Sequence, residues 1–137
     1  MKIAISALEY EPKIVRSRLV ASANNSYKGA IPEPVASAIA HAGGEGKFVF
    51  VDFYAEWCGA CKILDRTTLK DPTVVQTLRQ FVFLKVDADQ YPDAITHFNI
   101  VGMPTLIVLN LRGEEVYRQV GPIKADKLTS DLSALAL

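Results

Sequence analysis

Long apolar runs, an excess of either charge and cysteines beyond a single pair are all missing from this chain of 137 residues. No apolar stretch approaches the ~18 residues of a membrane-spanning helix, so membrane insertion is not expected. Fifteen basic residues balance fifteen acidic ones, which leaves no overall positive field for nucleic acid. Two cysteines are too few for a disulfide scaffold.

The start of the chain shows no export signal, because Glu9 interrupts residues 1–10 before an apolar signal core can develop. The chain as it stands is therefore expected to be cytoplasmic, and periplasmic if a leader or membrane segment has been removed. Its length and its 50% hydrophobic content suit one globular domain. We expect an N-terminal extension over 1–30, without a definite predicted structure, and a monomeric domain over 31–137.

Within 31–137 the hydrophobic pattern predicts a mixed α/β sheet covered by helices on both faces. A helix over 34–41 should end at Gly43 and Gly44. The strand over 47–55 is apolar on both alternating faces apart from Asp52, as expected for a central strand. The remaining elements are helices starting near Cys58 and Pro72, a strand at 81–87, a helix at 93–98, strands at 105–110 and 115–120 joined by a turn, and a helix at 124–135.

Cys58 and Cys61 carry the main chemical signal, because they follow this central strand directly and stand at the start of a helix. Residues three apart share a helix face, with Cβ atoms about 5–6 Å apart, close enough for a disulfide to open and close in place. Free N–H groups and the helix dipole stabilise a thiolate at this end. Cys58 is therefore predicted to be the nucleophile, and Cys61 to attack the mixed disulfide from within.

Three other roles for the pair compete with redox chemistry. A zinc site within one chain lacks ligands, since only His41 and His97 could join the cysteines. A structural disulfide would close too small a loop to restrict the unfolded chain by much, and inert thiols are not expected at a helix start. A non-catalytic module that holds a metal between two chains stays open as an alternative. No cofactor is predicted apart from the redox-active cysteine pair.

Residues 51–62, VDFYAEWCGACK, resemble the active-site signature of the thioredoxin family. Residues 83–89 are similar to the family's next central strand, residues 100–106 to its loop with a cis proline, and Gly121 to a glycine after its last strand. The stretch 54–74 resembles the C-terminal domain of DsbD-type thiol:disulfide interchange proteins. The resemblance implies a thioredoxin fold, thiol–disulfide exchange with disulfide-containing proteins, and an upstream thiol reductase that restores the dithiol.

Asp52 is the ionisable side chain inside the predicted central strand. Burial would raise the pKa of its carboxyl and suit it to accept a proton from Cys61. The alternative is an aspartate at a strand edge that faces water. By resemblance, Asp52 is the family's buried acid and Lys85 its partner, although Lys85 alone would be interpreted as a surface lysine.

Four further residues are expected to contact substrate or support the site. A cis peptide bond before Pro104 would expose the backbone of Met103 for β-type pairing with an extended substrate segment, and Thr105 belongs to the same motif. An ordinary trans turn proline is the alternative. Trp57, the only tryptophan, is expected to hold a polypeptide at the surface rather than to fill the core.

Gly59 and Ala60 separate the cysteines, and Ala60 stands where ordinary thioredoxins have proline. The residues at these positions leave a wide range of redox potentials open. A disulfide reductase is the predicted function, and a thiol oxidant or isomerase is the alternative within the same class.

Overall fold

The described part of the chain, residues 30–135 of a computed structural model, has its α-helices and strands in the predicted order. The N-terminal extension expected over 1–30 lies almost entirely outside the described residues. The elements are α3 (Val35–Glu45), β1 (Phe48–Tyr54), α4 (Gly59–Arg66), the 3₁₀ turn η1 (Thr68–Lys70), α5 (Pro72–Leu78), β2 (Phe81–Asp87), α6 (Pro92–His97), β3 (Thr105–Leu109), β4 (Glu115–Val120) and α7 (Ala125–Ser133).

The strands form one mixed sheet in the order β2-β1-β3-β4. β1 pairs parallel to β2 and antiparallel to β3, and β3 pairs antiparallel to β4. β1 is thus the central, doubly covered strand that its sequence predicts. Among the described residues β2 lies at one edge rather than in the centre of the sheet, because no described strand pairs with its outer side.

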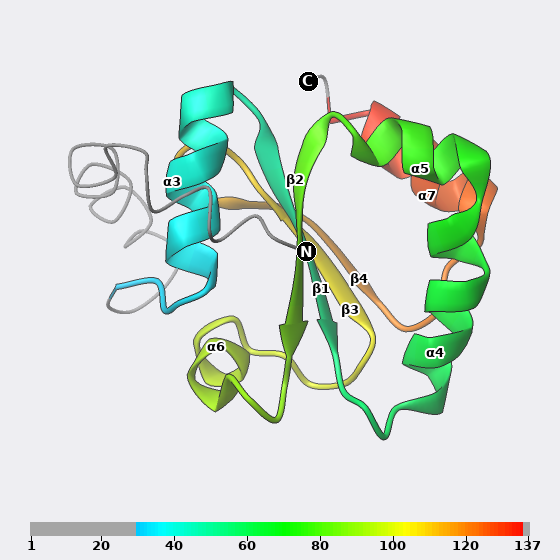
Figure 1. Cartoon of the computed structure of the whole chain (residues 1–137), viewed down its shortest axis with the longest axis horizontal. Helices are drawn as coiled ribbons and strands as arrows, with labels where there is room; N and C mark the ends of the chain where they lie inside the picture. Colours follow the sequence, from blue (N-terminus) through cyan, green and yellow to red (C-terminus); the bar gives the residue numbers. More distant parts are fainter. Residues whose placement is uncertain (1–29, 136–137) are drawn as a thin grey trace.

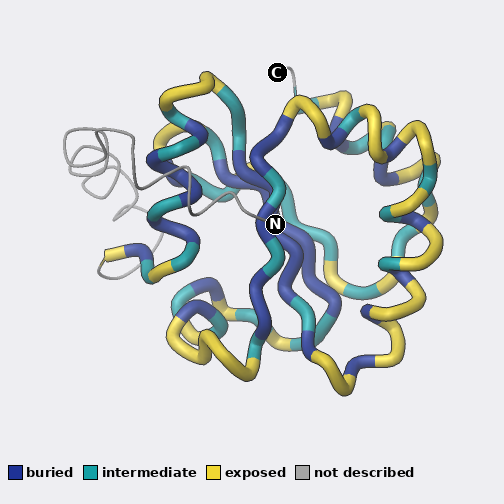
Figure 2. Tube along the Cα trace, viewed as in Figure 1, coloured by how far each residue is buried: buried dark blue, intermediate teal, exposed yellow. Residues whose placement is uncertain are grey.

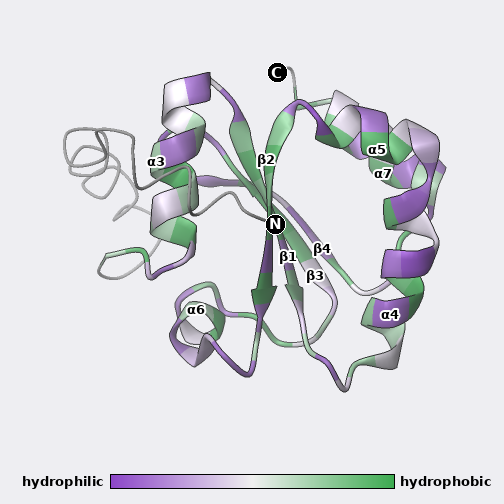
Figure 3. Ribbon diagram, in the orientation of Figure 1, coloured by the Kyte–Doolittle hydropathy of each residue, from purple (hydrophilic) through white to green (hydrophobic). Residues whose placement is uncertain are grey.

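Helices cover the two faces of the sheet in separate groups, α3 and α6 on one face and α4, α5 and α7 on the other (Figure 1). Alternate residues of β1 serve the two sides: Val49, Val51 and Phe53 pack in the α3 half of the core, and Phe50 packs in the α7 half. β1, β2 and β3 are mostly buried and β4 is only partly covered, whereas the helices present exposed, hydrophilic outer sides (Figures 2 and 3). This arrangement confirms the predicted α/β fold with helices on both faces.

The end of α3 differs from the sequence-based prediction. Gly43 and Gly44 lie inside the helix, which runs to Glu45 and ends at Gly46 in the left-handed conformation, with φ of 68°. A glycine in a helix interior costs only about 1 kcal/mol, so the first two glycines do not stop the helix. Only Gly46 takes the conformation that favours glycine over other residues.

The start of α5 follows the prediction from Pro72. Asp71 is the N-cap, and its carboxylate accepts hydrogen bonds from the backbone N–H groups of Thr73 and Val74. Pro72 occupies the first turn, where its missing N–H costs nothing. Among the described helices, none has the length and apolar character to cross a membrane.

Candidate active site

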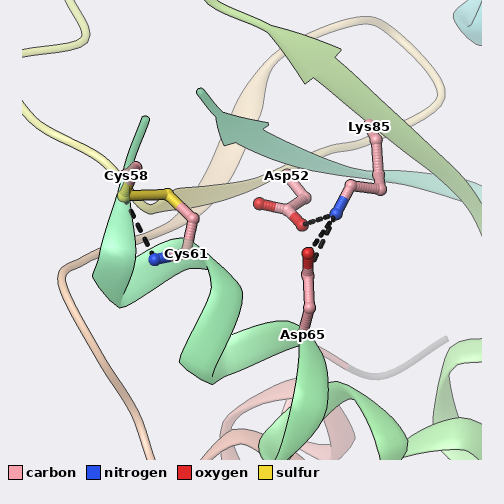
Figure 4. A network of polar contacts seen from close by, with 5 residues as sticks. All are labelled: Asp52, Cys58, Cys61, Asp65 and Lys85. Atoms are coloured by element: carbon pink, nitrogen blue, oxygen red, sulfur yellow. Dashed lines mark hydrogen bonds and ion pairs between the residues drawn. A yellow bond between two sulfur atoms is a disulfide. The ribbon is translucent and has the colours of Figure 1, made fainter. Parts of the chain in front are cut away.

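The disulfide between Cys58 and Cys61 lies where the chain leaves β1 and enters α4 (Figure 4). Cys58 is the N-cap of α4 with extended backbone, so it stands just outside the helix rather than in its first turn. Its Sγ accepts a hydrogen bond from the backbone N–H of Cys61 at 3.1 Å. A sulfur in this position is stabilised as a thiolate by the amino end of the helix once the disulfide is reduced.

Both cysteines are largely buried, but unequally. Cys58 is 6% exposed and Cys61 2%, and the two pack against Ala55 in a small apolar cluster of their own. Gly59 and Ala60, between them, are exposed. An incoming sulfur therefore finds Cys58 more accessible than Cys61.

Asp52 lies on the α4 side of β1, in the interior next to the disulfide (Figure 4). It is 1% exposed, and neither carboxylate oxygen accepts a hydrogen bond from the described residues. Burial raises the pKa of this carboxyl from 3.8 to about 6, while the Lys85 ammonium opposes the rise and Asp65 adds to it. The alternative of an aspartate facing water is wrong, because β1 is covered on both faces.

Lys85 is half-buried and bridges two carboxylates. Its Nζ lies 3.4 Å from Oδ2 of Asp52 and 2.9 Å from both carboxylate oxygens of Asp65. It also lies 4.5 Å from the centre of the Tyr54 ring. Burial disfavours the charge on Lys85, but Asp65 and Asp52 outweigh that effect and raise the pKa of the ammonium.

Asp65 is the residue of this network that sequence reasoning missed. It lies on α4, four residues after Cys61, where a charged side chain is normally interpreted as solvated. The signal that would reveal it is spatial: residues 52 and 85 are direct partners in the parallel β1–β2 register, and α4 lies over that pair.

The loop before β3 approaches the cysteines from the other side. The first residue of β3, Thr105, pairs with Phe53 near the end of β1, and Met103 packs against the cysteine cluster. The Met103–Pro104 peptide bond is cis. Thr105 is fully buried and its hydroxyl donates a hydrogen bond to the Gly102 carbonyl, so this side chain holds the loop from within.

Trp57 is exposed over 67% of its surface, directly before Cys58. Its indole Nε1 donates a hydrogen bond to Oδ2 of Asp89 at 3.0 Å, which ties the ring to the loop after β2. Val101, in the loop before β3, is 85% exposed. Trp57 does not fill the core, and two exposed apolar side chains belong to the segments around the disulfide.

The two histidines lie apart from this network. His41 on α3 lies with its Nε2 3.0 Å from Oε2 of Glu45, and His97 on α6 packs against Phe98. Burial lowers the pKa of His97. Among residues 30–135, no group of three or more His, Cys, Asp or Glu side chains is placed to hold a metal ion.

A disulfide at the amino end of a helix, beside a buried carboxyl and a proline loop, is typical of thiol:disulfide oxidoreductases. The thioredoxin family model matches residues 35–134. The chain therefore belongs to the thioredoxin family.

Individual relatives agree with this assignment. The thiol:disulfide interchange protein DsbD of Actinobacillus pleuropneumoniae is 35% identical over 97 residues, which are 66% of this chain and 17% of that protein. A thioredoxin from Thermus thermophilus superimposes with a TM-score of 0.68 at 27% identity, over 77% of this chain and 85% of the other. The oxidised C-terminal domain of DsbD from Neisseria meningitidis gives a TM-score of 0.63 at 28% identity, over 73% and 91%. The chain thus spans only a small part of the DsbD relatives that it matches.

Proposed function

We propose that the protein reduces disulfides in other proteins through the Cys58/Cys61 dithiol. The observation that supports this most is the unequal burial of the pair at the start of α4, with the more exposed sulfur on the N-cap. One cysteine can be approached by a substrate, and the other is kept for an internal reaction. This is the asymmetry that a two-step exchange requires.

In the first step, the Cys58 thiolate attacks one sulfur of a substrate disulfide. A Cys58–substrate disulfide forms, the substrate disulfide breaks, and the departing substrate sulfur takes a proton from solvent. In the second step, Cys61 gives its proton to the Asp52 carboxylate and attacks the Cys58 sulfur. The second substrate sulfur leaves as a thiolate, so the substrate gains two electrons and the Cys58–Cys61 disulfide is restored. An upstream thiol reductase must then reduce that disulfide.

The segments around the disulfide would hold the substrate. The Met103 backbone, beside the cysteine cluster, would pair with an extended peptide, as one strand adds to another. Trp57 would cover the apolar part of that peptide. Pro104 and Thr105 are buried behind the loop and would support its shape.

The DsbD resemblance supports a role at the cell envelope. Both the DsbD proteins and the solved DsbD C-terminal domain align with the part of the chain that carries the cysteines. We therefore propose that the exchange takes place in the periplasm, with electrons passing from an upstream thiol reductase to this domain and on to protein substrates.

Cysteine variants test the mechanism. Cys61→Ser should accumulate a covalent complex with a disulfide substrate such as insulin, because the second step cannot occur. Cys58→Ser should form no such complex and lose exchange by several orders of magnitude. Non-reducing mass spectrometry detects the complex, and equal trapping by both variants would contradict the assigned order.

The direction of exchange is tested by equilibrating the wild-type pair against glutathione buffers. A reductase requires a potential near that of thioredoxin, about −270 mV, and an oxidant one nearer about −120 mV. A value at the oxidising end would replace the reductase proposal with the oxidant alternative, which Ala60 between the cysteines keeps open. Metal analysis of the same sample addresses the remaining alternative, since a stoichiometric metal that protects both thiols would indicate a binding module.

A further inference from the structure

The Lys85 ammonium lies closer to Asp65, on the more exposed side of the site, than to the buried Asp52. Both oxygens of Asp65 lie 2.9 Å from its Nζ, whereas the nearer oxygen of Asp52 lies at 3.4 Å and accepts no hydrogen bond. Asp52 is 1% exposed, so its carboxylate has almost no contact with bulk solvent. The buried carboxyl thus has a cation nearby without a hydrogen bond to it.

We propose that Asp65 is a positioning residue that keeps the Lys85 ammonium out of hydrogen-bonding contact with Asp52, so that Asp52 stays basic enough to accept the Cys61 proton. This inference rests on the role of Asp52 in the proposed function. It adds a residue that is placed in contact with neither the cysteines nor the substrate and that acts on Asp52 mainly through Lys85.

The place of Asp65 in α4 supports a role beyond helix stability. It is the next-to-last residue of Gly59–Arg66, at the carboxyl end, where the helix dipole disfavours a carboxylate. Lys85 compensates that charge with two charge-assisted hydrogen bonds. Lys85 therefore stabilises the Asp65 carboxylate. The same two hydrogen bonds hold the ammonium closer to Asp65 than to Asp52.

The groups that face Asp52 come from every element packed around it. β2 contributes Lys85, α4 contributes Asp65 and the cysteine pair, and β1 itself contributes Tyr54. The β3 partner of Asp52 is Leu106, which is uncharged. Lys85 is thus the cation that faces Asp52 among the described residues, and the carboxylate that competes for it is Asp65.

Removing the Asp65 charge has two consequences, and both lower the pKa of Asp52. Lys85 becomes free to hydrogen-bond Asp52, and a hydrogen bond to the charged form lowers a carboxyl pKa. The negative charge that raises the pKa of Asp52 is also lost. Both changes make Asp52 a weaker base.

The test is a titration of the Asp52 carboxyl by carbon NMR on the full chain. In Asp65→Asn the midpoint should fall by about one pH unit relative to wild type, and Asp65→Glu should restore most of the difference. Asp126→Asn, which removes a carboxylate from the surface of α7, serves as the control and should leave the midpoint unchanged. An unchanged midpoint in Asp65→Asn would overturn the proposal.

The same substitution in a Lys85→Met background distinguishes a positioning role of Asp65 from a general loosening of the structure. With Lys85→Met, the Asp52 midpoint should rise, and adding Asp65→Asn should then shift it by less than half of its shift in wild type. An equal shift in both backgrounds would show that Asp65 does not act through Lys85. The rate at which Cys61 resolves a Cys58-linked mixed disulfide should fall at low pH, and the pH of this fall should shift together with the Asp52 midpoint. A fall that stays at the same pH in the variants would contradict proton transfer from Cys61 to Asp52.

Reduction of insulin by the wild-type chain is measured alongside these titrations. Absent reduction would reject the proposed function itself. Normal reduction together with an unshifted Asp52 midpoint would reject only the role of Asp65, so the two failures are distinguishable.

Discussion

Asp52 occupies a position that stability alone would give to an apolar side chain. Successive β1 residues alternate between the two halves of the core, and Asp52 lies on the same face as the buried ring of Phe50. A carboxylate there receives an ion pair at 3.4 Å and no hydrogen bond. A buried acid maintained at such a cost is typical of functional sites, where a shifted pKa serves proton transfer.

Trp57 provides the residue-scale prediction about substrate. Because the ring is exposed and fixed by Asp89, Trp57→Ala should lower kcat/KM for a protein disulfide roughly 10-fold, mainly through KM. The rate with a small disulfide such as oxidised glutathione should change less than about twofold, since little peptide needs to be held. Steady-state kinetics with both substrates measure the split.

The control for Trp57 is Val116→Ala, which removes an exposed apolar side chain from β4. Val116 lies near the start of β4, beside the end of β3 that is remote from the Pro104 loop. This variant should leave both substrates unaffected. An equal loss on both substrates in Trp57→Ala would mean that the indole acts on the cysteines rather than on the peptide.

The site residues differ in how visible they are in the sequence. Cys58, Cys61 and Asp52 stand in one segment, and the apolar strand around Asp52 already predicts its burial. Lys85 becomes a partner only through the β1–β2 register. Asp65 could not be found, because a charged residue on an exposed helix turn carries no sign of the strand that it faces. The catalytic roles of these residues stay predictions until the variants are measured.

At the scale of elements, the sequence predicts the positions of the strands more accurately than the ends of the helices. β1 and β2 are dense in β-branched and aromatic residues, and the predicted ranges differ from the observed ones by no more than a residue at most ends. The predicted end of α3 was wrong because Gly43 and Gly44 are compatible with either a helix or a turn. Only the φ of Gly46 decides between them, and the surrounding packing sets that angle.

The N-cap of α5 supports a prediction at the element scale. Asp71→Ala removes the acceptor for two helix N–H groups and should lower the free energy of unfolding by about 1 kcal/mol. Asp71→Asn keeps an acceptor oxygen and should stay close to wild type. Urea denaturation of the oxidised proteins measures both, and equal destabilisation by the two variants would show that the carboxylate charge, not the cap, matters.

At the scale of the whole molecule, the site lies at the end of the sheet where the inner strand β1 finishes and the inner strand β3 begins. The end of β1 and the start of β3 bring the disulfide and the Met103–Pro104 loop together. The helices of the α7 half cover the face that holds Asp52 (Figure 1). The acid is therefore buried by the same packing that stabilises the domain, which couples its ionisation to global stability.

That coupling predicts a pH-dependent stability. Unfolded, the Asp52 carboxyl has its ordinary pKa of 3.8, and folded, burial raises the pKa to about 6. Between these values the folded state holds the proton that the unfolded state has lost, so stability falls as the pH rises from about 4 to about 6 and stays lower above that. The shift corresponds to about 3 kcal/mol. Asp52→Asn removes this penalty, but the amide itself needs hydrogen bonds when buried.

We therefore expect Asp52→Asn to raise the free energy of unfolding by roughly 1–3 kcal/mol at about pH 7.5, and by much less near about pH 4. Urea unfolding of the oxidised proteins across this range measures the difference, with Asp126→Asn as the control for loss of a surface carboxylate. A gap between variant and wild type that is the same at both pH values would contradict the prediction, because it would mean that ionisation of Asp52 does not oppose folding. A gap that grows with pH, together with slower resolution of the mixed disulfide, would show that the same buried charge lowers stability and serves the exchange reaction.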